Sequence, residues 1–174
     1  MGLQEELEYR ADLPNAVQRG MQVVAQTKPG SWVLQKTLYR LDRPLHRWTD
    51  GRMTIPGVVT GLPVIILTTT GAKTGLPRVM PIVGIPLAGD IAVLGTNFAQ
   101  PRSPAWVLNL EAEPRARVAY RHRQVDVVAR PATDDEREAA WAGAIRVYRG
   151  FKAYRERITD RPVRIFVLER AGSD

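Results

Sequence analysis

The chain has 174 residues, and 25 Lys and Arg against 18 Asp and Glu give it a net charge of +7. This length predicts one domain. The absence of cysteine excludes disulfides, thiolate nucleophiles and zinc–thiolate sites. Only two histidines are present, His46 and His122. We expect both at the surface, and we expect no metal site and no Ser-His-Asp triad. The basic balance favours an anionic partner: nucleic acid, an acidic membrane surface or an anionic small molecule.

The N-terminal part is predicted to be a polar extension over residues 1–30, followed by a single domain over 31–174. No apolar run reaches the roughly 18 residues of a membrane-spanning helix, and no secretory signal is expected, so a cytoplasmic location is the default. Residues 31–48 predict an amphipathic helix with a basic face beside Trp32 and Trp48. Two interpretations stay open for this helix: packing on the domain, or peripheral contact with an anionic membrane at the inner face of the cell membrane.

Apolar periodicity and turn residues divide the rest into short strands and helices. In chain order we predict a strand over 61–71, a turn and strand over 71–87, a strand over 90–96, a helix over 104–114, strands over 115–121 and 123–132, a helix over 133–148, a turn or short helix after it, and a strand over 163–169. Prolines place the 71–87 strand at an edge or at a bulge. Thr133 and Glu136 match a capping box. About six mostly antiparallel strands with helices between them indicate an α+β barrel or open sheet.

Charged residues are scarce between positions 61 and 110, where only Lys73, Arg78, Asp90 and Arg102 occur. This stretch is therefore expected to hold much of the core. The GAKTG segment at 71–75 lacks the spacing of a nucleotide phosphate loop. It is either a simple hairpin turn with a solvated lysine or a turn whose backbone N–H groups and Lys73 meet an anion. If Arg78 is buried, it needs a carboxylate or a ligand anion as partner.

Three aromatic residues, Tyr148, Phe151 and Tyr154, are spaced by three, and helical spacing would put them on one face. They form either part of the core or a cavity wall among several arginines. Such an aromatic and basic pattern also occurs in proteins that bind single-stranded nucleic acid, but no nucleic-acid motif is present. Trp106 is either a core anchor or part of a site formed with the loop before it.

Three segments resemble one known family, the deazaflavin-dependent nitroreductases and quinone reductases of actinobacteria, which use coenzyme F420. The segments are LPVIILTTTGAKTGLPRVMPIVG (62–84), GTNFAQPRSPAWVLNLEAEPRARV (95–118) and YRGFKAYRERITDRPVRIFVLE (148–169). The resemblance runs from about Pro44 to Glu169. It implies a split β-barrel related to the pyridoxamine-phosphate-oxidase barrels. It also implies an oxidoreductase in which reduced F420 delivers a hydride to a quinone, a nitro compound or an activated alkene.

The same resemblance implies where the cofactor lies. The residues expected to bind it are Ala72, Lys73, Thr74, Arg78, Val79, Met80, Pro81, Ile82, Val83, Leu94, Gly95, Thr96, Asn97, Trp106 and Phe151. Lys73 and Arg78 would meet its phosphate and acidic tail. Tyr148 and Tyr154 are the expected catalytic residues. Many relatives have arginine in place of Ala72, and some have tyrosine in place of Phe151. Unlike that tyrosine, Phe151 cannot donate a proton.

Three alternatives to an F420-dependent enzyme stay open. The first is a flavin mononucleotide-dependent enzyme of the same barrel type, and the second is a non-catalytic protein that binds F420 or another anion. Nucleic-acid binding is the third and is supported only by charge. The oligomeric state and the physiological acceptor are not fixed by these residues.

Overall fold

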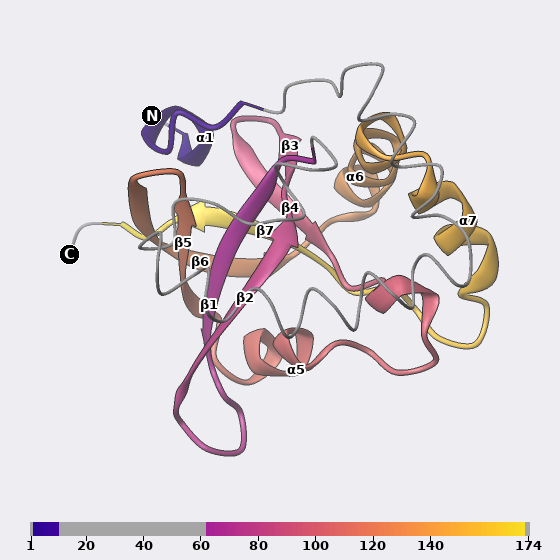
Figure 1. Cartoon of the computed structure of the whole chain (residues 1–174), viewed down its shortest axis with the longest axis horizontal. Helices are drawn as coiled ribbons and strands as arrows, with labels where there is room; N and C mark the ends of the chain where they lie inside the picture. Colours follow the sequence, from indigo (N-terminus) through magenta and orange to yellow (C-terminus); the bar gives the residue numbers. More distant parts are fainter. Residues whose placement is uncertain (1, 11–61, 173–174) are drawn as a thin grey trace.

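The computed structural model describes residues 2–10 and 62–172 of the chain. A seven-stranded sheet with the order β2-β1-β5-β6-β7-β4-β3 forms the body, and every pair of neighbours is antiparallel. The sheet curls into a half-barrel (Figure 1). The strands are β1 (Val64–Thr70), β2 (Pro77–Val83), β3 (Ile85–Leu87), β4 (Asp90–Leu94), β5 (Arg115–Tyr120), β6 (Arg123–Pro131) and β7 (Ile165–Arg170). The expected antiparallel α+β fold is confirmed, with seven strands in place of about six.

The edges of the sheet are the two strands that contain the prolines of segment 71–87. This segment was expected to form one strand, but it breaks at Gly84 into β2 and β3, which end up at opposite edges. Edge strands tolerate proline because one side of each makes no ladder bonds. At the break, a Cβ on Gly84 would lie 2.8 Å from the Tyr9 hydroxyl, so only glycine allows this close approach.

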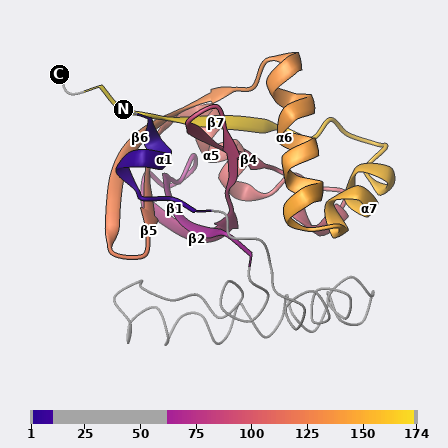
Figure 2. The same ribbon diagram turned by 90° about the horizontal axis from the view of Figure 1, so that it is seen from above.

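The helices close the ends and one side of the half-barrel (Figure 2). They are α1 (Leu3–Glu6), α5 (Ala105–Ala112), α6 (Asp134–Val147) and α7 (Gly150–Arg157), with a short turn η1 (Asn97–Ala99) before α5. The predicted capping box is confirmed, because the Thr133 side chain and the Glu136 side chain each accept the other's backbone N–H. Pro104 is the N-cap of α5 rather than its first helical residue.

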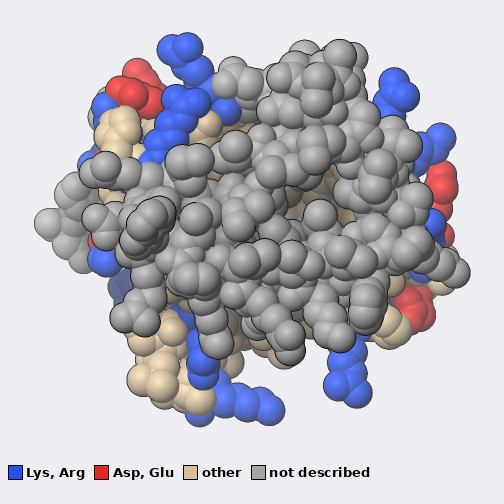
Figure 3. Space-filling view, in the orientation of Figure 1, with Lys and Arg blue, Asp and Glu red and all other residues tan. Residues whose placement is uncertain are grey.

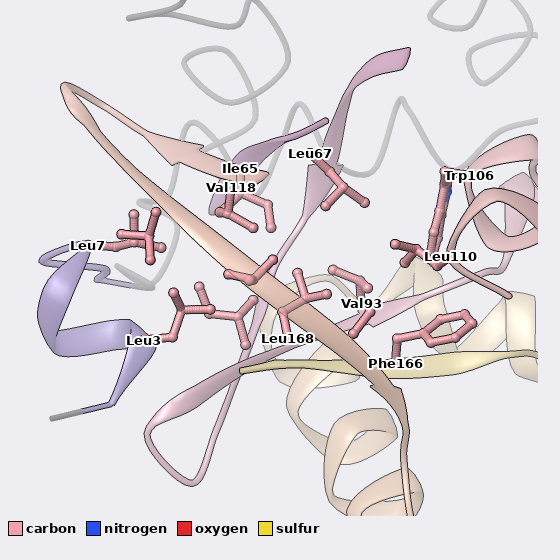
Figure 4. Close-up of a cluster of buried hydrophobic side chains, with 14 of the residues drawn as sticks. Leu3, Leu7, Ile65, Leu67, Val93, Trp106, Leu110, Val118, Phe166 and Leu168 are labelled. Atoms are coloured by element: carbon pink, nitrogen blue, oxygen red, sulfur yellow. The ribbon is translucent and has the colours of Figure 1, made fainter. Parts of the chain in front are cut away.

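The main core lies between the sheet, α5 and α1 (Figure 4). Much of it comes from residues 61–110, as expected from the scarcity of charge there; Ile65, Leu67, Ile91 and Val93 are completely buried. A second cluster packs α6 and α7 against β3, β4 and the start of β7. Two apolar clusters thus hold the loops between them in fixed positions.

The first ten residues contribute to this core, although the sequence analysis assigned them to a polar extension. Leu3, Leu7 and Tyr9 are buried in the main cluster. The Tyr9 hydroxyl lies 2.7 Å from the Gly84 carbonyl and 3.1 Å from the Pro63 carbonyl, its two acceptors. Burial raises the pKa of Tyr9 far above its ordinary value. This tyrosine therefore joins the N-terminal segment to the break between β2 and β3.

The predicted amphipathic helix at 31–48, and the rest of the extension from residue 11, lie outside the described residues. Within the residues that are described, no helix is long and apolar enough to cross a membrane.

Candidate functional site

The turn between β1 and β2 is closed by its own backbone. The Gly71 N–H donates to the Leu76 carbonyl at 2.9 Å, and the N–H groups of Thr74 and Gly75 donate back to the Gly71 carbonyl at 3.1 and 2.7 Å. Gly75 has a φ of +65°, a left-handed conformation that glycine adopts without cost. Of the two interpretations of this turn, the simple hairpin turn is the one that these three N–H groups support, because each is bonded within the turn.

Asn109 in α5 fixes this turn from inside the protein. Its side-chain carbonyl accepts the Ala72 N–H at 3.0 Å, and its amide donates to the Thr69 hydroxyl at 2.9 Å. Both Asn109 and Thr69 are buried. A buried amide with both ends satisfied holds its partners in one geometry. The turn is thus attached to α5. The Ala72 N–H, like those of Gly71, Thr74 and Gly75, is already bonded within the protein.

The two cations of the turn, Lys73 and Arg78, are exposed, so Arg78 does not need a partner on account of burial. Arg78 donates to the Thr74 hydroxyl at 3.3 Å. Its Nε would lie 3.3 Å from a Cβ on Gly71, so glycine lets the guanidinium lie across the turn. Within residues 2–10 and 62–172, no ion pair involves Lys73 or Arg78. Basic side chains project from the end of this hairpin at the bottom of Figure 3.

The other predicted hairpin residues alternate along β2. Val79 is 53% exposed, whereas Met80 and Ile82 pack against the main core. Val83 packs against the second cluster, and Pro81 is exposed. The start of this strand is therefore exposed, whereas Met80, Ile82 and Val83 anchor it to the two clusters.

The segment after β4 has an unusual backbone. Leu94, Gly95 and Thr96 are buried, and then Asn97, Phe98 and Ala99 all adopt left-handed conformations with φ of 48°, 54° and 59°. Asparagine tolerates this region, but Phe98 and Ala99 each cost about 1–2 kcal/mol there. Non-glycine residues in such conformations persist where the surroundings hold them, often at functional sites.

Arg161 supplies that hold. Its guanidinium donates to the carbonyls of Gly95 at 3.1 Å, Thr96 at 3.0 Å and Gln100 at 3.2 Å. The Asn97 amide also donates across the loop to the Arg102 carbonyl at 2.9 Å. The loop that the sequence analysis assigned to the cofactor ring is thus built around an arginine that it did not single out.

Trp106 is a core residue. It is 5% exposed and packs against Phe166 with the ring centroids 6.2 Å apart. Of the two interpretations of this residue, core anchor is the one its burial supports. It also fixes the start of α5, directly after the loop held by Arg161.

Tyr148, Phe151 and Tyr154 form one aromatic cluster, with centroid separations of 5.9, 6.3 and 5.7 Å. They do not share one helix face, because Tyr148 is the C-cap of α6 and the other two belong to α7. Gly150 makes this arrangement feasible: a Cβ at this position would lie 2.3 Å from the Tyr148 ring. Phe98 reaches the cluster from η1, 6.5 Å from the Tyr154 ring.

The two tyrosine hydroxyls differ in acidity. Burial raises the pKa of Tyr148, and a hydrogen bond with Tyr154 partly opposes this rise. Burial, the neighbouring Tyr148 and the same hydrogen bond raise the pKa of Tyr154 strongly. Because the pKa of each phenol is raised from 10.0, both groups are protonated at neutral pH.

The predicted residues fall into two groups joined by α5. Asn109 ties the cationic turn to the C-terminal half of α5, and the loop held by Arg161 leads into its N-terminus and touches α7 through Phe98 (Figure 1). No contact in the described part of the chain joins Lys73 or Arg78 directly to the aromatic cluster. Asn109 and Arg161 were missed by the sequence analysis, because their partners are distant in sequence.

Exposed cations without carboxylate partners suit an anionic group, and shielded phenols suit a step that moves a proton. The curled antiparallel half-barrel that carries them belongs to the split-barrel class of folds. A sequence model of the family described as F420H(2)-dependent quinone reductase matches residues 38–170. The chain belongs to this family and is an F420-dependent reductase.

Individual relatives agree with this assignment. A Mycobacterium tuberculosis protein named F420H(2)-dependent quinone reductase is 30% identical over 138 residues, which cover 76% of this chain and 90% of the relative. A solved structure described as an F420-H2 dependent reductase has 31% identity and a TM-score of 0.56, over 62% of this chain and 94% of the other. Another, described as a domain-swapped dimer, has 30% identity and a TM-score of 0.59, over 82% of this chain and all of the other.

Proposed function

We propose that the chain reduces a quinone with electrons from reduced F420. The observation that carries this proposal is the pair of tyrosines beside the loop held by Arg161, of which Tyr148 is buried and Tyr154 is partly buried. Quinone reduction requires a proton at an oxygen atom in addition to a hydride. The rings of Tyr148 and Tyr154 lie 6.3 Å apart, and burial raises the pKa of both phenols, so both hold a proton at neutral pH.

The residues that would hold F420 lie on the cationic turn and the loop after β4. Lys73, Thr74 and Arg78 would bind its phosphate and acidic tail, with Ala72 and the exposed start of β2 alongside. Leu94, Gly95, Thr96 and Asn97 would lie along the ring. Charged hydrogen bonds from Lys73 and Arg78 suit this role because neither cation has a carboxylate partner in the described part of the chain. Trp106 and Phe151 support the site from behind.

When bound, reduced F420 supplies a hydride, that is, two electrons and one hydrogen nucleus. The protein orients the acceptor against the exposed side of the Phe98 ring, beside the tyrosines. Tyr148 then donates its proton to the acceptor oxygen, which carries negative charge after hydride addition. Tyr154 passes its proton to Tyr148, and solvent reprotonates Tyr154. The quinone leaves as the hydroquinone.

Nitroaromatic compounds and activated alkenes are the second class of acceptor. Both develop negative charge on oxygen when they accept a hydride, and the same phenol can protonate it. Which acceptors the enzyme reduces then depends on the side chains that contact the acceptor rather than on the proton donor.

The proposal is tested with the purified full chain in two steps. Fluorescence titrations with F420, flavin mononucleotide and a single-stranded oligonucleotide separate the three classes of ligand, and we expect tight binding only for F420. Steady-state oxidation of reduced F420 with menadione, a nitroaromatic compound or an enone then follows. F420 binding without oxidation by any acceptor would indicate a carrier, and preference for flavin mononucleotide would reject the cofactor placement.

Peripheral membrane contact and a cytoplasmic location stay predictions, because the segment 31–48 on which the contact depends lies outside the described residues.

A further inference from the structure

We propose that Phe98 determines specificity for planar ring acceptors, and that Arg161 is the positioning residue that presents it. This inference rests on the proposed function and concerns the acceptor rather than the cofactor. It starts from the left-handed turn at Asn97–Ala99, where three successive non-glycine residues hold an unfavourable backbone conformation.

The Phe98 side chain points away from the core although it is large and apolar. It is 49% exposed, yet its ring meets the Tyr154 ring edge-on at 6.5 Å. Tyr154 in turn contacts Tyr148, the proposed proton donor. The exposed part of the Phe98 ring thus lies at the outer end of a continuous aromatic cluster. A planar quinone that packs against this ring would have its oxygen directed toward the tyrosine hydroxyls.

Arg161 forms hydrogen bonds to the backbone on both sides of the turn. It donates to the Gly95 and Thr96 carbonyls before the turn and to the Gln100 carbonyl after it. One planar guanidinium can serve these three acceptors at once, whereas a lysine ammonium presents its donors with different geometry on a more flexible stem. No carboxylate in the described ranges forms an ion pair with Arg161. The hydrogen bonds of Arg161 therefore go to the backbone of the loop, and the conformation of this backbone determines the direction of the Phe98 side chain.

Steady-state kinetics with menadione at saturating reduced F420 test the role of Phe98. We expect Phe98→Ala to raise the KM for menadione about 5- to 20-fold, because the acceptor loses an apolar ring contact. Phe98→Leu should raise it about 3-fold, because it keeps apolar area but loses the ring. The F420 affinity, measured by fluorescence titration, should stay within about 2-fold of wild type in both variants. An unchanged KM for Phe98→Ala overturns the proposal.

A double-mutant cycle tests whether Arg161 acts through Phe98. Arg161→Ala and Arg161→Lys should each raise the KM for menadione. Adding Phe98→Ala to either Arg161 variant should change the KM of that variant by less than about 2-fold. Independent effects that multiply would overturn the positioning role. Arg164→Ala is the matched control: its side chain pairs with Glu111 at the surface, at 2.8 Å, and we expect a wild-type KM.

Hydrogen exchange gives a readout that needs neither cofactor nor turnover. The amides of Ala99 and Gln100 donate to the carbonyls of Thr96 and Asn97 within the turn. Arg161→Lys should speed their exchange at least about 10-fold while the amides of β7 exchange as in wild type. Equal exchange in wild type and variant would overturn the role of Arg161. If wild type does not oxidise reduced F420 with menadione, the proposed function fails, and this measurement still decides whether Arg161 holds the turn.

Discussion

The arginines of this protein behave differently in two regions. Several arginines of β5, β6 and β7 pair with carboxylates: Arg130 contacts Glu136 and Glu169, each at 2.6 Å, and Arg117 contacts Asp126 at 2.6 Å. At the β1–β2 turn and the loop after β4, the basic residues make no such pair within the described ranges. Arg78 bonds a hydroxyl, and Arg161, from the segment between α7 and β7, bonds carbonyls of the loop after β4.

This difference separates basic residues that hold the fold from those free to bind a ligand. A paired guanidinium already has its charge compensated, so an added anion gains little from it. An exposed cation beside a rigid turn gains a full charged hydrogen bond when an anion arrives. The exposed cations of the β1–β2 turn, rather than the paired arginines, are therefore the basic residues that concern the cofactor.

The largest expected effect is on cofactor affinity. Replacing Lys73 or Arg78 by alanine should weaken F420 binding by about 1.5–3 kcal/mol each, the scale of a charged hydrogen bond. Fluorescence titration measures this change. Arg117→Ala, which removes a paired surface arginine, should leave the affinity as in wild type. Equal affinities for all three variants would remove the distinction between the two regions.

The next effect concerns the proton. Tyr148→Phe removes only the hydroxyl and should lower turnover with menadione about 10- to 100-fold at nearly unchanged F420 affinity. Burial raises the pKa of Tyr148 above its ordinary value of 10.0, so the phenol remains protonated and wild-type turnover should not fall through its deprotonation between pH 6 and about 9. Full turnover in both Tyr148→Phe and Tyr154→Phe would assign the proton to water or the cofactor.

Most of the fold could be predicted because its signals are local. The capping box at Thr133, the alternation in β5 and β6 and the prolines at the sheet edges each act within a few residues. The break at Gly84 was not predicted, because it depends on Tyr9, which is distant in the sequence. Leu3 and Leu7 were likewise assigned to a polar extension, since two leucines among acidic residues do not show that a helix turn docks on a sheet.

The candidate site shows the same limit. Lys73, Arg78 and the aromatic residues could be named from their types and from family resemblance. The residues that position them, Asn109 and Arg161, act through contacts across 37 or more residues, such as Asn109 to Ala72. A single sequence carries no sign of such contacts, because neither an asparagine in a helix nor an arginine in a loop is unusual.

A smaller effect follows from the attachment of the turn to α5. Asn109→Ala leaves the buried Thr69 hydroxyl and the Ala72 N–H without their partner, and should lower the free energy of unfolding by about 1.5 kcal/mol. Urea denaturation measures this loss. Glu111→Ala on the same helix removes only a surface ion pair and should change it by less than about 0.5 kcal/mol. If F420 affinity does not also fall in Asn109→Ala, the turn keeps its shape without this bond.

The smallest effect belongs to the paired region and to acid pH. The hydrogen bonds from Arg130 and then from the Thr133 backbone lower the pKa of Glu136 from 4.5 to about 2. A carboxyl group with a lowered folded-state pKa stabilises the protein fully above its ordinary pKa, and this contribution is lost as the pH falls from 4.5 through about 2. Glu136→Gln should therefore lower the free energy of unfolding by about 1 kcal/mol at pH 7 and by progressively less below pH 4.5. Glu138→Gln, on the same helix, alters an exposed pair with Arg155 and should leave the acid dependence as in wild type. Urea denaturation between pH 7 and pH 3 compares the two, and F420 affinity at pH 7 should be the same in both, because neither carboxylate lies in the region of free cations.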